Sequence, residues 1–193
     1  MSWFQPEAAM SLGLIGQAAP VRESSIIDVG AGASRLVDGL LERGYRSVTV
    51  LDVSAAALDH AQRRLATVAA DAAGSVTWHN ADVLTAELPE SEFDVWHDRA
   101  VFHFLTDATD RAAYTAQVRR ALRPHGYVII ATFAEDGPTR CSGLDVHRYS
   151  PDALQREFGD DFRLVESQRE EHHTPWESTQ AFTYCLLRYE PQE

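Results

Sequence analysis

A short apolar run that ends in a glycine turn is the feature that most restricts how this chain can fold. Residues 25–29 read Ser-Ile-Ile-Asp-Val, and the turn Gly30-Ala31-Gly32 follows directly. Such a run suits a buried parallel strand, and glycines let a ligand lie against main-chain N–H groups without meeting a Cβ atom. The segment therefore predicts a strand, a ligand-binding turn and then a helix, which Ser34 can cap.

Strand-like and helix-like segments alternate along the rest of the chain. After residues 25–29, strands are predicted at residues 48–52, 76–80, 93–97, 127–133, 162–173 and 179–189. Helices are predicted at residues 6–18, at 34–43, after a cap at Ser54, at 107–122, and from Ser150-Pro151-Asp152 onward. This order favours one α/β domain over residues 1–193, built on a doubly wound sheet with an antiparallel edge.

The sequence also predicts the form of two connections between these elements. The helix over residues 107–122 should end where Pro124 stops it and Gly126 allows a turn. Residues 134–149 are a long polar loop, and a loop of that length in a compact domain tends to be functional.

Three aspartates stand where predicted strands end. Asp28 precedes the glycine turn, Asp52 ends the second strand and Asp82 follows the third. The carboxyl ends of parallel strands share one edge of the sheet, where open α/β proteins bind ligands. Asp28 is placed to accept a hydrogen bond from an ammonium group, and Asp52 from two ribose hydroxyls. Asp82 can accept from an adenine amino group, beside the main-chain N–H of Val83.

Arg35 argues against a nicotinamide dinucleotide at this turn. The dinucleotide fingerprint requires glycine or alanine three residues after its second glycine, for close helix–strand packing, and this chain has Arg35 there. Asp28 would also repel a pyrophosphate. The turn therefore favours a cofactor that carries a cation, and a nicotinamide oxidoreductase is the disfavoured alternative.

Residues 24–134 resemble the class I S-adenosylmethionine (SAM)-dependent methyltransferase superfamily. The resemblance lies in Asp28-x-Gly30-x-Gly32-x-Ser34, Asp52, Asp82-Val83 and Phe93-Asp94-x-x-x-Asp98. It implies a Rossmann-like seven-stranded sheet of order 3-2-1-4-5-7-6 with strand 7 antiparallel. It also implies that SAM is the cofactor and S-adenosylhomocysteine (SAH) the product. The cofactor-binding residues so implied are Asp28, Gly30, Ala31, Gly32, Ser34, Asp52, Val53, Asp82, Val83 and Asp98.

A narrower similarity covers three further stretches. Residues 2–6, 97–104 and 141–144 resemble a bacterial group of small, mostly uncharacterised methyltransferases. Members of that group usually carry an aromatic and acidic segment upstream that helps to cover SAM. The resemblance therefore predicts an N-terminal helical segment over residues 1–20 that lacks this upstream lid.

The segment after the fourth strand is expected beside the reactive methyl group. His97 and Asp98 are predicted to contact the amino-acid part of SAM or the acceptor, and His103 is the candidate general base. A packed histidine is the alternative for His103. Arg99 pairs either with an acidic acceptor or with a neighbouring carboxylate.

The polar loop supplies the remaining candidates for binding the acceptor. Arg140, Cys141 and Tyr149 lie within or at the end of it, and Cys141 could face a thiol or another soft acceptor instead of packing in the core. The spacings of cysteine and histidine match no familiar metal motif, so no metal is predicted.

The net charge and the cysteine content limit which binding partners and which cell compartment are expected. A net charge of −12 argues against nucleic acid and anionic membranes, and no apolar run is long enough to span a bilayer. Two distant cysteines and the lack of a signal peptide predict a cytoplasmic protein. We expect it to be a monomer or a homodimer. The sequence thus predicts methyl transfer to a small molecule, such as a thiol or other soft nucleophile. A protein methyltransferase for lysine or an N-terminus, and a SAM-binding module without turnover, are the alternatives.

Overall fold

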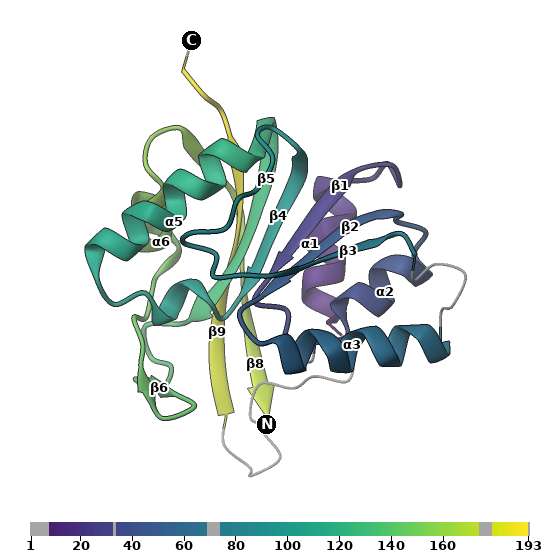
Figure 1. Cartoon of the computed structure of the whole chain (residues 1–193). Coiled ribbons are helices and arrows are strands. Elements are labelled where there is room, and N and C mark those ends of the chain that lie inside the picture. The colour runs from purple at the N-terminus through teal and green to yellow at the C-terminus, as the bar shows by residue number, and fades with distance from the viewer. Residues whose placement is uncertain (1–7, 33, 69–73, 174–178, 193) are drawn as a thin grey trace.

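A seven-stranded sheet forms the centre of the molecule (Figure 1). The computed structural model describes residues 8–32, 34–68, 74–173 and 179–192. The order of the strands across the sheet is β3-β2-β1-β4-β5-β9-β8. Their bounds are Ser25–Val29 (β1), Ser47–Asp52 (β2), Val76–Asn80 (β3), Phe93–Arg99 (β4), Leu122–Phe133 (β5), Phe162–His173 (β8) and Thr179–Tyr189 (β9).

The strand order confirms the predicted 3-2-1-4-5-7-6 arrangement, in which β8 and β9 are the sixth and seventh main strands. Strands β3, β2, β1, β4 and β5 run parallel to one another, whereas β9 is antiparallel to both β5 and β8. The carboxyl ends of β1, β2 and β4 therefore lie together at one edge of the sheet.

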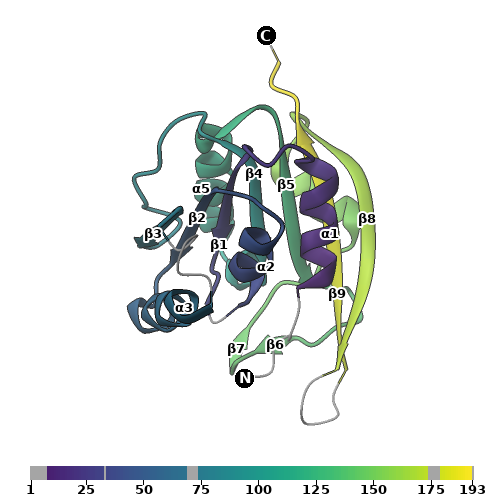
Figure 2. The same cartoon turned by 90° about the vertical axis from the view of Figure 1, so that its right-hand side faces the viewer.

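Helices cover both faces of the sheet, as Figures 1 and 2 show. Apolar residues of α1 (Ala9–Ala18), α2 (Leu36–Glu42) and α3 (Ala55–Val68) belong to the hydrophobic cluster on one face. Those of α5 (Ala108–Ala121) and α6 (Pro151–Phe158) belong to the cluster on the other. Alternate residues of each central strand enter opposite clusters, because successive side chains of a strand point to opposite faces. The sheet is thus buried on both sides.

Local signals account for several of the helix boundaries. Ser150 caps α6 by accepting from the Ala153 N–H at 3.3 Å, and the Ser34 hydroxyl accepts from Leu36 N–H at the start of α2 at 3.1 Å. Gly44, with φ of +92°, follows the end of α2, as expected for a residue past a helix C-terminus. These caps agree with the sequence-based expectations.

Other boundaries differ from expectation. Strand β4 runs two residues further, to Arg99, and the N-terminal helix starts at Ala9; residues 6 and 7 of its predicted span lie outside the described residues. The long loop contains a small hairpin, β6 (Arg140–Cys141) and β7 (Leu144–Asp145). Residues 2–6, which carry part of the narrower resemblance, also lie outside the described residues.

The turn after α5 corrects the role expected of its glycine. Strand β5 begins at Leu122, directly after the helix, and the positive φ of +67° falls on His125. Gly126 is needed for another reason, since a Cβ atom there would lie 2.9 Å from the Arg123 carbonyl oxygen and 3.0 Å from that of Asp94. Among the helices of the described part of the chain, none is long and apolar enough to cross a membrane.

Candidate active site

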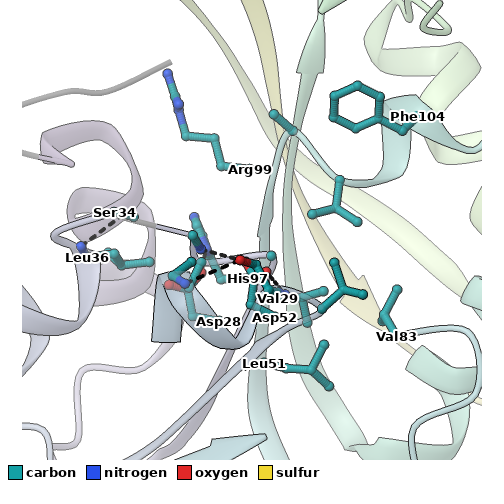
Figure 3. A pocket seen from close by; sticks show the side chains of 18 of the residues that line it. Asp28, Val29, Ser34, Leu36, Leu51, Asp52, Val83, His97, Arg99 and Phe104 are labelled. Atoms are coloured by element: carbon teal, nitrogen blue, oxygen red, sulfur yellow. Dashed lines mark hydrogen bonds and ion pairs between the residues drawn. The ribbon is translucent and has the colours of Figure 1, made fainter. Parts of the chain in front are cut away.

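A cavity of about 820 Å³ opens at the carboxyl edge of the sheet, within the usual range for small-molecule sites. Its walls come from the ends of β1, β2 and β4, from α1 and α3, and from the β6 hairpin. Figure 3 shows this cavity with Asp28, Asp52 and His97 grouped near its centre, and with Val83 and Phe104 on one side. The sequence placed the site at this edge, and the cavity lies there.

The glycine turn forms part of the cavity wall, at positions whose backbone angles and close contacts require glycine. Gly30 and Gly32 both have positive φ, +64° and +54°. A Cβ atom at Gly30 would lie 1.9 Å from the Val101 Cγ2 atom. The turn is therefore held close against the segment after β4, and its main chain is open to the cavity. Ala31 and Ser34 line the cavity as well.

Asp52 ties the glycine turn to the start of α3. Its Oδ2 atom accepts from Gly32 N–H and its Oδ1 atom from Ser54 N–H, each at 2.7 Å. The carboxylate is 7% exposed and lines the cavity. Each carboxylate oxygen can accept a second hydrogen bond, so Asp52 still has acceptor capacity for ligand hydroxyls. Val53, next to it, is 75% exposed at the cavity rim.

Asp82 and Val83 form another part of the wall. The exposed Asp82 accepts from Leu84 N–H through Oδ1 at 2.9 Å, and Val83 is buried with its side chain in the core. Both line the cavity. Asp28, Asp52 and Asp82 give this part of the cavity wall an acidic character, which suits a cationic ligand rather than a pyrophosphate.

Asp28 and His97 form a buried pair. His97 Nδ1 lies 2.7 Å from Asp28 Oδ1, and His97 Nε2 lies 2.8 Å from the Ser11 hydroxyl (Figure 3 shows the first of these contacts). All three side chains line the cavity. Because both ring nitrogens of His97 are engaged by protein groups, the direct ligand contact predicted for His97 is not what this geometry favours.

Asp98 corrects the prediction of a catalytic and cofactor-binding contact. It is fully buried and is not in the wall of the cavity. Its carboxylate accepts from Val101 N–H at 2.8 Å, from Phe102 N–H at 3.0 Å and from the Tyr114 hydroxyl at 2.5 Å. Burial raises the pKa of Asp98 to about 6, and the Tyr114 hydrogen bond opposes that rise. Asp98 therefore holds the turn after β4 in place.

His103 corrects the prediction of a general base. It is fully buried and is not in the cavity wall. Its ring packs edge-on against Phe104 and at a tilt against Phe133, with centroids 4.6 and 4.8 Å away. Burial, together with the charge of Arg99, lowers the pKa of His103 to about 3. The alternative of a packed histidine is the one that the structure supports.

Arg99, at the end of β4, also lines the cavity. Its Nε–H donates to the Tyr184 hydroxyl at 2.9 Å, and its guanidinium lies 3.8 Å from Glu170. The guanidinium also stacks over Phe182, 4.5 Å from the ring centroid. Figure 3 shows the Arg99 side chain extending away from the group formed by Asp28 and Asp52.

The polar loop contributes less than predicted. Cys141 and Ser142 line the cavity, and burial raises the pKa of the Cys141 thiol. Arg140 is exposed, pairs with Asp145 at 3.1 Å and is not in the cavity wall. Tyr149 is buried against Phe102, also outside this wall. The acceptor-binding roles predicted for Arg140 and Tyr149 are thus not matched by their positions.

Several lining residues escaped the sequence analysis. Ser11, Phe104 and Phe182 come from a helix, a short 3-10 turn (Phe102–Phe104) and a late strand, far apart in the chain. Phe104 ends the 97–104 stretch that carries the narrower resemblance, but that resemblance assigned it no role. Ser11 and Phe182 belong to no local motif, and only the fold brings them to the carboxyl edge.

Comparisons with known proteins agree with this geometry. Residues 26–126 match the family described as methyltransferase domain. An uncharacterised methyltransferase of Mycobacterium tuberculosis and one of Mycobacterium bovis are each 31% identical to the chain over 131 residues. The matched region is 68% of this chain and 60% of each relative. The chain thus spans about 60% of the length of these curated relatives.

Solved structures share the fold. A Burkholderia thailandensis 1,6-didemethyltoxoflavin N1-methyltransferase with bound 1,6-didemethyltoxoflavin and SAH has a TM-score of 0.75 at 24% identity, covering 96% of this chain and 80% of that one. The glycopeptide N-methyltransferase MtfA complexed with SAM has a TM-score of 0.71 at 18% identity, covering 94% and 93%. On the match over residues 26–126, the chain belongs to the methyltransferase domain family, and it shares the fold of these solved methyltransferases.

Proposed function

We propose that this chain transfers the methyl group of SAM to a small-molecule acceptor. The observation that carries the proposal is one cavity whose wall combines two chemically different sets of residues. The acidic part of the wall is the glycine turn with three aspartates, Asp28, Asp52 and Asp82. The other set is Arg99, Phe104, Phe182 and Cys141. A cofactor against the acidic part and an acceptor against the other set would share one cavity.

The residues of the acidic part of the wall fit SAM. SAM carries a cationic amino group and a ribose diol, and both need hydrogen-bond acceptors. Asp28 Oδ2 is buried and has no hydrogen-bond partner among the described residues. Asp52 retains acceptor capacity at the end of β2, and the glycine turn leaves the main chain open to a ligand. In this proposal Asp28 takes the amino group, Asp52 the ribose, and Asp82 with Val83 the adenine.

When bound, SAM supplies a methyl group on a sulfonium, which is already a good leaving group. The protein then has to align the acceptor and to exclude water. His103, the predicted general base, lies in the core away from the cavity, and so does Asp98, which was predicted to contact SAM or the acceptor. This supports a reaction driven by proximity, and an acceptor such as a thiol or other soft nucleophile that needs little help from a base.

Calorimetry with SAM, SAH and NADH tests the cofactor assignment. We expect SAM and SAH to bind and NADH to give no heat. Binding of NADH without SAM would overturn the proposal. SAM binding without release of SAH for any acceptor would leave a SAM-binding module without turnover.

Asp52→Ala tests the ribose assignment within the same assay. Because the variant loses a buried hydrogen-bond acceptor, SAM binding should weaken by about 1–3 kcal/mol. Asp110→Ala is the matched control, since Asp110 is an exposed carboxylate on α5. Equal affinities for wild type and Asp52→Ala would refute the assignment.

Release of SAH across thiols, amines, phenols, carboxylates and basic peptides tests the acceptor class. We expect turnover with a small molecule. A net charge of −12 would attract a basic protein substrate, so turnover with lysine-rich peptides alone would favour the protein methyltransferase instead.

A further inference from the structure

A line of buried polar side chains runs beneath α1 and ends at Asp28. Ser11 of α1, His97 of β4 and Asp28 of β1 are 1%, 3% and 2% exposed. The Ser11 hydroxyl lies 2.8 Å from His97 Nε2, and His97 Nδ1 lies 2.7 Å from Asp28 Oδ1. Burying three polar groups is costly unless each is hydrogen-bonded, so this line is a specific feature of the fold.

The partners indicate where the protons sit. An ionised carboxylate can only accept hydrogen bonds, so His97 Nδ1 must be the donor to Asp28. The other ring nitrogen, Nε2, lies within hydrogen-bond distance of the Ser11 hydroxyl, so protein groups engage both ring nitrogens. Only one of the two Asp28 oxygens is used in this line of contacts.

The second oxygen of Asp28 is the unusual one. Asp28 Oδ2 is buried and has no hydrogen-bond partner among the described residues, although the side chain lines the cavity. A buried carboxylate oxygen without a donor is destabilising, and a donor from a ligand would remove that cost. Because His97 holds Oδ1, the free oxygen has one fixed direction.

Ser11 is itself anchored from the far side. Its hydroxyl also forms a hydrogen bond with Tyr184 of β9. Tyr184 in turn accepts from Arg99 Nε–H at 2.9 Å and donates to Glu170 at 3.1 Å. The orientation of Ser11 therefore depends on α1 resting on β9, which links the placement of the helix to the carboxylate in the cavity.

We propose that Ser11 and His97 are positioning residues that hold Asp28 with its Oδ2 atom presented to the cationic amino group of a ligand. The inference rests on the proposed function, in which that amino group belongs to the amino-acid part of SAM. Neither Ser11 nor His97 touches the reacting atoms in this scheme; both act through Asp28.

Two ligands distinguish a positioning role of Ser11 and His97 from a role in packing alone. SAH has the amino-acid group, whereas 5′-methylthioadenosine keeps the adenosine and the thioether but lacks that group. In calorimetric titrations, Ser11→Ala should weaken SAH about threefold to tenfold, the range of one neutral hydrogen bond, and leave methylthioadenosine unchanged. Asp28→Asn should weaken SAH about tenfold to hundredfold with the same selectivity, because a charge-assisted hydrogen bond is lost.

Conservative variants add a second readout. The side-chain amide of asparagine can replace the His97 Nδ1–H, so His97→Asn should retain SAH affinity better than His97→Leu. Thr115→Val is the matched control, since it removes a buried helical hydroxyl from α5 on the opposite face of the sheet. It should change neither titration, and thermal unfolding of each variant reports any loss of folded protein.

The outcomes divide cleanly. Selective loss of SAH affinity in Ser11→Ala and His97→Leu supports the inference. Equal losses for SAH and methylthioadenosine, or no loss for either, overturn it while the proposed function stands. Failure of the wild-type protein to bind SAH overturns the proposed function, and this inference with it.

Discussion

Two buried aspartates at neighbouring strand ends behave in opposite ways. Asp28 lies one residue before the end of β1, and Asp98 lies one residue before the end of β4, the adjacent parallel strand. Both are at most 2% exposed. Asp98 accepts three hydrogen bonds and is out of reach of the cavity. Asp28 accepts one, keeps one oxygen without a partner among the described residues, and lines the cavity. Burial alone therefore does not distinguish a binding carboxylate from a structural one; the state of its oxygens does.

The alternation of side chains along β4 explains why Asp98 does not line the cavity. His97 and Arg99 point to the face that carries α1 and the cavity, whereas Trp96 and Asp98 point to the face that carries α5. On that second face Tyr114 links the two, donating to Asp98 and accepting from the Trp96 indole at 2.9 Å. One strand thus supplies a ligand-facing polar group and a structural one at consecutive positions.

Asp98→Ala should give the largest effect and tests the structural half of this comparison. Three donors would lose their acceptor: Val101 N–H, Phe102 N–H and the Tyr114 hydroxyl. We expect the free energy of unfolding in urea to fall by about 3–5 kcal/mol, since each buried unsatisfied group costs about 1–3 kcal/mol. A loss below 1 kcal/mol would show that Asp98 is not the structural partner described.

Gly30→Ala should give the next largest effect and tests how the two aspartates are coupled. Asp98 holds Val101 through its N–H, and Val101 Cγ2 would lie 1.9 Å from a Cβ atom at Gly30. Positive φ and overpacking should together lower the free energy of unfolding by about 2–4 kcal/mol and weaken SAH binding.

The double variant Gly30→Ala with Val101→Ala separates the two causes of that loss. Removing the Val101 methyl groups relieves the clash but leaves the strain of positive φ at residue 30. Part of the unfolding free energy should therefore return. If none returns, the contact with Val101 does not limit the turn.

The sequence predicted one aspartate correctly as lining the site and misplaced the other, and the reason is physical. Asp28 follows from a strand that must run into a glycine turn, so its place at the edge of the sheet needs no tertiary information. Asp98 depends on where β4 ends. The strand was expected to stop at residue 97, whereas it continues to Arg99, so strand alternation turns Asp98 away from the cavity.

The rest of the site could not be read from local patterns. Ser11 reaches His97 only because α1 packs across β4 and β5, and Phe182 arrives through the antiparallel strand β9. The alternation of elements predicted the α/β class with an antiparallel edge, and the family resemblance implied the order of the strands. The side chains that complete the cavity depend on helix packing, which has no signature of its own in the sequence.

A pH titration of His103→Phe should give a smaller effect and tests whether a buried base acts at the site. The pKa of His103 is lowered from 6.5 to about 3, so the folded state keeps this ring neutral while the unfolded chain takes up a proton below pH 6.5. The contribution of His103 to stability is therefore present above pH 6.5 and is lost as the pH falls toward 3.

The difference between the wild type and His103→Phe isolates this contribution. Between pH 7 and pH 5 the wild type should lose about 2 kcal/mol of unfolding free energy relative to the variant, at 1.36 kcal/mol per pH unit below 6.5. Asp98, with its raised pKa, acts in the opposite direction, but it is common to both proteins and cancels. The pH profile of methyl transfer should be the same in both. A profile that loses its acidic limb in His103→Phe would restore His103 as the general base.

Tyr149→Phe should give the smallest effect, and it sharpens the rule drawn from the two aspartates. The Tyr149 hydroxyl, like Asp28 Oδ2, is buried without a hydrogen-bond partner among the described residues. It is neutral, however, and it borders a separate cavity of about 470 Å³ rather than the proposed site. Removing an unsatisfied hydroxyl should leave the free energy of unfolding within about 1 kcal/mol of wild type, with SAH affinity and acceptor KM unchanged. A rise in KM would return Tyr149 to the acceptor site. A larger loss of stability would mean that an ordered water or a residue outside the described ones satisfies the hydroxyl. If neither change appears, an unpartnered buried atom indicates a ligand only when it also carries charge and lines the cavity, as Asp28 does.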